Sequence, residues 1–317
     1  MKRGTLLWLA ACLCLQGAGL LHGADIFRFY APPGSLALNA SYESGSLEYL
    51  DFTIEHEGAA VASWFVTLSQ GQSLSFDPRI MNKGADLLEY QVYGEEPPTT
   101  TIIKDTSVGL SADNVVTGSD FGAFAAAMEQ KSFQMVVHIP ESQFNAAGSY
   151  SDTAVLSLYT GTPANPGSHF LVDTATAAFS GRMARIVDIS CVREVGILSL
   201  DLTSDLTDFK VATVYETSNA DLGYTVSVTS ANLAADSVGQ TGPYFQHESG
   251  GDTLSYDLSY SGAAVTGWTS GTAEVTDAAG LTASAGDPRE VRISYSGDAG
   301  LRSGSYRDTL TFSITAK

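Results

Sequence analysis

The sequence has 317 residues, 35 of them acidic and 16 basic, and a formal net charge of −19 at pH 7. Nucleic acid and anionic membrane surfaces are poor partners for such a chain, because like charges repel. Only 16% of the residues are charged, while Gly, Ser and Thr abound, which indicates an exported all-β protein rather than a disordered acidic one.

The first residues are organised like a secretory signal. A basic start precedes an apolar run, and small residues follow at Gly23 and Ala24, so we expect a signal peptide at 1–24 that is removed on export. A lipid anchor at Cys12 is the competing interpretation, because "LAAC" fits a lipoprotein cleavage box. No later segment approaches the roughly 20 apolar residues of a membrane-spanning helix, so we expect no transmembrane segment.

Cys191 would be the one cysteine left after removal of the signal, because Cys12 and Cys14 lie within it. An intramolecular disulfide is therefore not expected. Cys191 lies in the predicted strand "RIVDISCV", and we expect its thiol to be buried as a small apolar group. A thiol available for a bridge to another chain is the alternative.

Short alternating runs separated by Gly, Ser, Asn and Pro predict a sandwich or barrel of β-strands. The one candidate helix is 121–130, "FGAFAAAMEQ". In chain order, the predicted strands are 64–69, 87–93, 135–139, 146–161, 169–179, 185–192, 224–229, 254–260, 291–295 and 304–317.

The pattern around the last predicted strand occurs twice. The segment "AAGSYSDTAVLSLYTG" at 146–161 matches "RSGSYRDTLTFSITAK" at 302–317, and segments upstream of both match as well. A repeat of about 160 residues is too long for a solenoid and indicates two copies of one domain. We therefore predict two tandem immunoglobulin-like β-sandwich domains, at 25–180 and 181–317.

The shared "GSYxD" element suggests a structural corner. In immunoglobulin-like sandwiches a Tyr near the start of the penultimate strand hydrogen-bonds back to the chain, and Tyr150 and Tyr306 fit that position. Asp152 and Asp308 share the inward face of these strands, so each carboxylate must be hydrogen-bonded, and we expect it to tie a turn rather than to act in catalysis.

The last predicted strand places Leu310, Phe312 and Ile314 on one face and polar residues on the other. The sequence adds nothing after this strand that would cover its edge, and an uncovered edge invites pairing with another chain. If the second domain lacks a final strand, these three side chains line an open groove. Closure of the sandwich by "RIVDISCV" is the alternative.

Catalytic and metal-binding motifs are absent from the sequence. The histidines have no metal-ligand spacing, and we interpret Asp201, Asp205 and Asp208 as a solvated loop rather than a calcium site. We therefore expect no metal, no cofactor and no enzymatic activity. A secreted hydrolase with paired carboxylates that the sequence does not reveal is the alternative.

A domain boundary is suggested by Pro163, Pro166 and Gly167, which follow the first copy of the pattern. We expect an exposed linker at 161–168. The segment after it, "HFLVDTATAAF", is predicted to complete the first domain as its last strand.

The stretch "FDPRIMNKGADLLEYQVYG" at 76–94 resembles the spore coat protein U domain family, as does the "AGxYxDT" pattern at 147–153. This resemblance implies a subunit of an archaic chaperone-usher pilus, exported through the periplasm to the cell surface. It also implies three partners: a periplasmic chaperone, an usher and a neighbouring pilin subunit that donates a strand. The matching positions in the first stretch are Arg79, Met81, Leu88, Tyr90, Val92 and Tyr93.

Pro32 and Pro33 would interrupt a donor strand at the start of the mature chain. A subunit that accepts a strand but cannot donate one belongs at the pilus tip, so the resemblance implies a two-domain tip adhesin. A free-standing secreted structural or carbohydrate-binding protein with two complete sandwiches is the alternative.

The apolar stretch with Phe121, Phe124 and Met128 is predicted to contribute to an exposed adhesive loop. The alternative is a short helix that closes one end of the sandwich, since apolar residues usually belong to a core.

Overall fold

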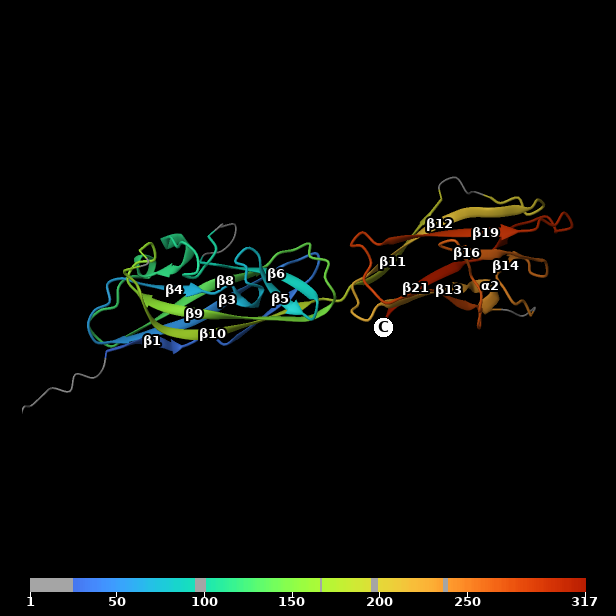
Figure 1. The fold of residues 1–317 in the computed structure, drawn as a ribbon. Coiled ribbons are helices and arrows are strands. Elements are labelled where there is room, and N and C mark those ends of the chain that lie inside the picture. The colour runs from blue at the N-terminus through green and yellow to red at the C-terminus, as the bar shows by residue number, and fades with distance from the viewer. Residues whose placement is uncertain (1–24, 95–100, 166, 195–198, 236–238) are drawn as a thin grey trace, which may run out of the picture.

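The computed structural model describes residues 25–94, 101–165, 167–194, 199–235 and 239–317, which form a mostly β protein. The expected signal peptide, with Cys12, lies outside the described residues. Figure 1 shows two bodies of strands joined by a short connection. We call residues 25–183 the first unit and residues 187–317 the second unit, because each has its own hydrophobic core. No helix in the described ranges is long and apolar enough to cross a membrane.

The described strands of the first unit form one sheet that wraps around its core. Its order is β1-β3-β8-β6-β5-β9-β10-β2, with β4 paired to β9 and to β7. The strands and short helices are β1 (Ile26–Ala31), β2 (Ser35–Ala40), β3 (Ser46–Glu57), β4 (Trp64–Leu68), η1 (Gly71–Ser73), β5 (Arg79–Lys83), β6 (Asp86–Tyr93), η2 (Ala112–Asn114), β7 (Val116–Thr117), α1 (Gly118–Phe121), β8 (Glu129–Ile139), β9 (Gly148–Thr160) and β10 (Phe170–Met183).

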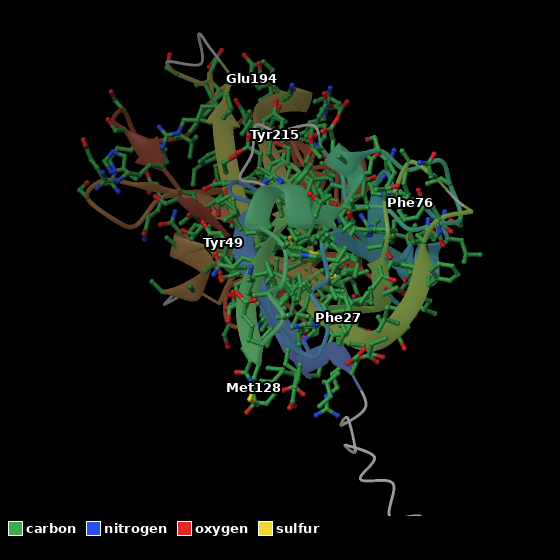
Figure 2. The ribbon with its side chains drawn as sticks, turned by 90° about the vertical axis from the view of Figure 1, so that its left-hand side faces the viewer. Phe27, Tyr49, Phe76, Met128, Glu194 and Tyr215 are labelled. Atoms are coloured by element: carbon green, nitrogen blue, oxygen red, sulfur yellow. The ribbon has the colours of Figure 1, made fainter. Side chains whose placement is uncertain are left out.

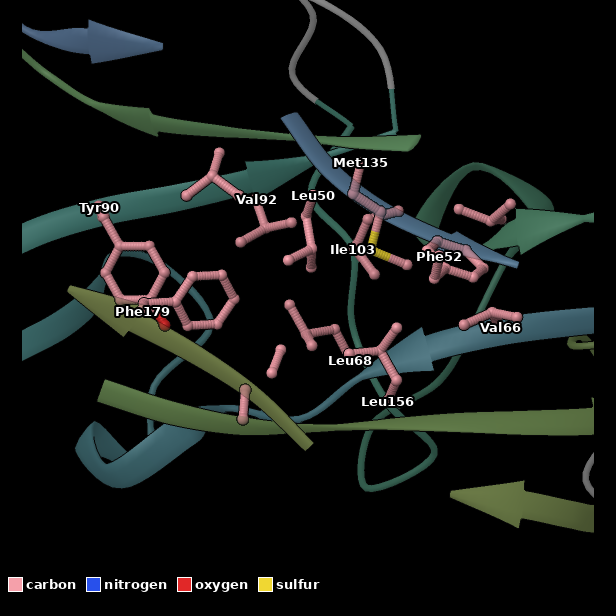
Figure 3. Close-up of a cluster of buried hydrophobic side chains, with 14 of the residues drawn as sticks. Leu50, Phe52, Val66, Leu68, Tyr90, Val92, Ile103, Met135, Leu156 and Phe179 are labelled. Carbon is pink, nitrogen blue, oxygen red and sulfur yellow. The ribbon is translucent and has the colours of Figure 1, made fainter. Parts of the chain in front are cut away.

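The core of the first unit lies between strands on two sides, as Figure 3 shows. Alternation along each strand places every second side chain inside. Phe52 of β3, Leu156 of β9 and Phe179 of β10 are each at most 1% exposed. Full burial of such side chains stabilises a fold by about 1.5–3 kcal/mol each.

The second unit contains three smaller sheets. Their orders are β11-β12-β19-β16-β17, β18-β13-β21 and β15-β14-β20. The elements are β11 (Val187–Arg193), β12 (Leu206–Ser218), β13 (Tyr224–Ser230), α2 (Ala231–Ala234), β14 (Tyr244–His247), β15 (Thr253–Ser255), β16 (Asp257–Tyr260), β17 (Ala263–Ala264), β18 (Thr272–Ala278), β19 (Asp287–Tyr295), β20 (Tyr306–Arg307) and β21 (Leu310–Ala316).

The helix predicted at 121–130 is wrong. The helix α1 ends at Phe121, and Gly122 follows it with φ 83°, a conformation that favours glycine. Phe124 then forms a two-way backbone bridge with Val61, with N–O distances of 3.0 Å. The bridge holds the segment extended, so the apolar run does not continue as a helix.

The strand predicted after the 161–168 segment is confirmed. The described residues between β9 and β10, 161–165 and 167–169, are exposed or half-buried, and β10 pairs antiparallel with β9 on one side and parallel with β2 on the other. β10 extends to Met183, three residues beyond the expected boundary at 180. The first unit therefore closes its sheet with a strand of its own.

Asn219 connects the two units at their junction. Its Nδ2 donates to the carbonyl oxygens of Asn145 (3.1 Å) and Ala184 (2.9 Å), and its backbone oxygen accepts from the N–H of Ala147 (2.8 Å). Its Oδ1 accepts from the N–H of Ile186 (2.6 Å). The side chain is fully buried, so one satisfied amide holds the first unit, the connection and the second unit together.

Replacing Phe179 tests whether β10 belongs to the core. We expect Phe179→Ala to lower the free energy of unfolding of the first unit by about 3–5 kcal/mol, because a buried ring leaves a cavity. Phe170→Ala is the matched control on the same strand, since Phe170 is 71% exposed, and we expect less than about 0.5 kcal/mol. Thermal unfolding followed by circular dichroism measures both. Equal losses would show that β10 does not close the core.

Candidate functional site

The two copies of the "GSYxD" element form the same corner. In the first unit the hydroxyl of Tyr150 donates to the carbonyl oxygen of Ala146 at 2.7 Å, and in the second the hydroxyl of Tyr306 donates to that of Arg302 at 3.1 Å. Both bonds span four residues backwards along the chain. Burial raises the pKa of Tyr150 to about 12, so its hydroxyl stays a donor at neutral pH.

Asp152 ties the turn η1 to β9. Its Oδ1 accepts from the N–H of Gln72 (2.8 Å), and its Oδ2 accepts from the hydroxyl of Tyr90 (2.6 Å). Burial, followed by the bond to Asp152, raises the pKa of Tyr90 above its ordinary value. The carboxylate is therefore held by donors and has a structural position.

Asp308 occupies the corresponding position in the second unit. It accepts from the N–H of Asn232 (3.1 Å) in α2 and from the hydroxyls of Tyr256 (2.7 Å) and Ser230 (2.7 Å). Burial and the charge of Asp308 raise the pKa of Tyr256. Both copies of the corner thus include a tyrosine hydroxyl that donates to the aspartate. β9 therefore corresponds to the segment that contains β20 and β21.

Corresponding side chains on these two strands differ in burial. On β9, Ala154, Leu156 and Leu158 are at most 1% exposed. Their counterparts on β21 are larger or equal in size, yet all three are only half-buried. These counterparts are Leu310, Phe312 and Ile314, the side chains that the sequence predicts for a groove.

Pairing explains the difference in burial. β9 lies between β4 and β10, whereas β21 pairs with β13 alone among the described strands. The backbone oxygen of Thr309 accepts from the N–H of Ala231, and the N–H of Lys317 donates to the backbone oxygen of Gly223. In an antiparallel pair of strands every second residue bonds to the partner, so the odd-numbered residues from 309 to 317 bond to the β13 side. The amides of Leu310, Phe312 and Ile314 therefore point away from β13. One backbone edge of β21 is open along the described chain.

A groove runs beside this open edge. One hollow of about 330 Å³ lies between β21 and β11, and its lining includes Phe312, Leu310 and Cys191. A larger hollow of about 970 Å³ lies between residues 301–308 and residues 199–203. Together they follow the edge that β10 covers in the first unit. We call the two hollows the strand groove.

The expectation that Cys191 is buried is wrong. Cys191 pairs with Val214, a fully buried residue, so both side chains lie on the core side of the sheet, but the thiol is exposed. Its inward position is consistent with the alternation in the sequence, and the open groove beside it accounts for the exposure. Partial burial still raises the pKa of the Cys191 thiol, against the effect of Arg193.

The predicted adhesive loop is divided between core and surface. Phe124 is fully buried against Phe27 and Trp64, so its prediction as an exposed residue is wrong. Phe121 is 46% exposed and contacts Phe133 edge-on, and Met128 is 73% exposed. Figure 2 shows Met128 at the edge of the first unit, pointing away from the ribbon. Phe121 and Met128 remain available for contact.

A buried carboxylate in the second unit was not predicted from the sequence. Glu216 is fully buried and accepts from the hydroxyls of Tyr224 (3.0 Å), Tyr260 (2.7 Å) and Thr276 (2.7 Å), and from Nε of Arg289 (3.1 Å). Burial, followed by the charge of Glu216, raises the pKa of Tyr224 to about 12. The one feature of the sequence that could have indicated this buried carboxylate is a Glu at an inward position of an alternating strand. With four donors it is a structural group.

The acidic loop at Asp201, Asp205 and Asp208 is held by hydrogen bonds and an ion pair within the second unit. Asp201 accepts from the hydroxyl of Thr203 (2.6 Å), and Asp208 pairs with Arg292 (3.0 Å). Within the described ranges no three His, Cys, Asp or Glu side chains gather where they could hold a metal ion.

Arg79 of the first sequence motif is a buried structural residue. Its guanidinium donates to the carbonyl oxygens of Leu68 (3.2 Å) and Ile103 (2.6 Å) and to the side-chain oxygen of Gln91 (2.8 Å). Burial lowers its pKa to about 10. The motif therefore links β4, β6 and the segment after residue 100.

Residues 53–157 match the Spore Coat Protein U domain family. The resemblance seen in the sequence is confirmed for this range, which contains Arg79, Met81 and the corner at Tyr150. The match begins within β3 and ends within β9, so the spore coat protein U domain lies in the first unit and omits β10. No curated protein matches the chain by sequence.

Three solved structures are similar to this chain over most of its length, at low sequence identity. The complex of the chaperone CsuC with the tip adhesion subunit CsuE, from archaic Csu pili of Acinetobacter baumannii, has 11% identity, a TM-score of 0.40, and coverage of 90% of this chain and 98% of that one. A chaperone–tip adhesin complex of CFA/I fimbriae has 10% identity, a TM-score of 0.38, and coverage of 93% and 98%. A mutant of CfaE, the CFA/I adhesin of enterotoxigenic E. coli, has 9% identity, a TM-score of 0.34, and coverage of 90% and 93%.

Labelling of Cys191 tests whether the strand groove is open. In a chain that begins at Asp25, we expect the thiol to react with a maleimide without denaturant and faster as the pH rises, because the thiolate is the nucleophile and the pKa of this thiol is raised. The control is Ala154→Cys in a Cys191→Ser background, on the buried strand of the spore coat protein U domain, and we expect it to stay unreactive. Mass spectrometry measures the adducts. A Cys191 as unreactive as the control would mean that the groove is closed.

Proposed function

We propose that this protein is a subunit of a chaperone-usher pilus and that its second unit accepts a β-strand from another chain. The observation that carries the proposal is the contrast between β9, covered by β10, and β21, uncovered on the same edge. Strand addition would supply backbone hydrogen bonds to this edge and alternate side chains to the groove. The match of residues 53–157 to the spore coat protein U domain supports it, because that resemblance implies this pilus class.

The first unit provides a template for the missing strand. Ala177 and Phe179 of β10 are buried opposite Ala154 and Asp152, and Gly181 lies opposite Tyr150. A Cβ at Gly181 would meet three core side chains at 2.9–3.2 Å, so the strand must come close to the corner there. An incoming strand for the second unit would run antiparallel to β21 with the same alternation.

The described N-terminal segment is already used inside the first unit. β1 pairs with β3, β2 pairs with β10, and Pro32 and Pro33 lie between them where the chain changes partner. Residues 26–40 are therefore not free to enter a neighbour. This supports a subunit that accepts a strand without donating these residues, which is the arrangement expected at a pilus tip.

Adhesion is the role that we propose for the first unit. It is closed by its own strand, so it needs no neighbour to fold, and its exposed Phe121 and Met128 provide apolar contact area. Export through the periplasm, a chaperone that occupies the strand groove before assembly, and an usher follow from the same pilus class. Before assembly the open backbone edge of β21 and its half-buried apolar side chains would otherwise favour aggregation.

A self-complemented variant tests the proposal. A copy of residues 161–183 is appended after Ala316. The copied β10 can then pair with β21 in the same register in which β10 pairs with β9. We expect the second unit to gain about 2–4 kcal/mol, because Leu310, Phe312 and Ile314 become fully buried. We also expect Cys191 to lose its reactivity. Calorimetry and thiol labelling measure the two effects.

The control for this variant carries Ala177→Asp and Phe179→Asp in the appended copy, which place charges in the groove. We expect neither stabilisation nor protection of Cys191. If the intact copy also has no effect, and co-expression with a periplasmic pilus chaperone gives no complex, the second unit is not a strand acceptor.

A further inference from the structure

A second hollow lies on the first unit, away from the strand groove. Its volume is about 710 Å³, within the range of small-ligand sites, and its lining includes Tyr49 of β3 and Phe121 of α1. These two rings are 39% and 46% exposed, although most aromatic side chains of this unit are buried. Figure 2 labels Tyr49 on the flank of the first unit. We call this hollow the Tyr49–Phe121 hollow.

Polar cross-strand pairs form part of the lining of the hollow. Gln134 of β8 donates to Oδ1 of Asp51 at 2.8 Å, and the hydroxyls of Thr53 and Ser132 lie 3.0 Å apart. These bonds fix the side chains in place. They leave Oδ2 of Asp51 and Oε1 of Gln134 without a hydrogen-bond partner among the described residues, and the Asp51 and Gln134 side chains are exposed. Both atoms are acceptors that a hydroxyl-bearing ligand could use.

The charge of the hollow disfavours anionic ligands. Among the described residues that line it there is no Lys, Arg or His, and Asp51 contributes a carboxylate. Lys131, on the neighbouring part of β8, pairs with Glu129 and donates to the carbonyl oxygen of Ala123. The chain as a whole carries a net charge of −19. A neutral ligand suits a lining of aromatic rings, hydroxyls and one carboxylate that already accepts from Gln134.

We propose that the Tyr49–Phe121 hollow binds a neutral saccharide. The apolar C–H face of a sugar ring stacks on an exposed aromatic ring, while its hydroxyls bond to carboxylate, amide and hydroxyl groups held in place beside it. The hollow offers both kinds of contact on a rigid pair of strands, β3 and β8. This inference rests on the proposed role of the first unit in adhesion and names the class of ligand.

Saturation-transfer NMR on the chain that begins at Asp25 tests the proposal, with lactose, maltose and N,N′-diacetylchitobiose as probes. We expect at least one of them to bind, and Tyr49→Ala and Asp51→Ala each to weaken it by about fivefold or more. Tyr49→Phe keeps the ring and is expected to retain most of the binding. Phe170→Ala removes an exposed ring elsewhere on the first unit and is expected to change nothing.

Three outcomes overturn the proposal: no binding of any of the three sugars, binding that Tyr49→Ala and Asp51→Ala leave unchanged, or preferred binding of sialyllactose, which is anionic. Labelling of Cys191 in the same variants reports on the strand groove separately. A failure of sugar binding with an open, strand-accepting groove would thus contradict the saccharide site and leave the pilus proposal standing.

Discussion

A β-strand with an unpaired edge beside a hydrophobic core is the constraint on which this structure depends. Backbone N–H and C=O groups on such an edge, and the side chains beneath it, gain most when another strand pairs there. In the first unit β10 meets this need from within the same chain. In the second unit the equivalent edge of β21 has no partner among the described strands.

Two copies of one corner make this difference interpretable. Because Tyr150 and Asp152 repeat in Tyr306 and Asp308, with similar hydrogen bonds to a backbone oxygen and from a tyrosine hydroxyl, β9 serves as an internal reference for β21. In the reference strand, covered by β10, the alternate side chains are fully buried, whereas in the second unit they are half-buried. The buried amide of Asn219 joins the two units, so a load on the first unit would pass to the second through a satisfied junction.

The duplicated corner and the alternating face of β21 could be predicted from the sequence, because both depend on local spacing. The position of Phe124 could not, since it follows from a backbone bridge to Val61, far away in the chain. The alternation of β11 places Cys191 on the core side, but its exposure depends on the strand groove beside it, where no described strand lies. Glu216 was missed because its donors come from four different strands, β13, β16, β18 and β19.

The polar cross-strand pairs of the Tyr49–Phe121 hollow also depend on strand pairing that the sequence does not reveal. Asp51 and Gln134 are 83 positions apart, and register alone brings them opposite each other on β3 and β8. Sequence alternation predicts that both point outward, but not that they pair. Pairings between distant strands therefore decide which exposed residues can act together.

Hydrogen exchange of individual amides, measured by NMR on the chain that begins at Asp25, tests the central claim most directly. The amides of Leu156 and Leu158 face β10, and those of Phe312 and Ile314 face the strand groove. The account predicts that the first pair exchanges more slowly than the second by orders of magnitude, while Thr311 and Ser313, bonded to β13, stay protected. Equal protection of Phe312 and Leu156 would show that the second unit is already closed and would contradict strand acceptance.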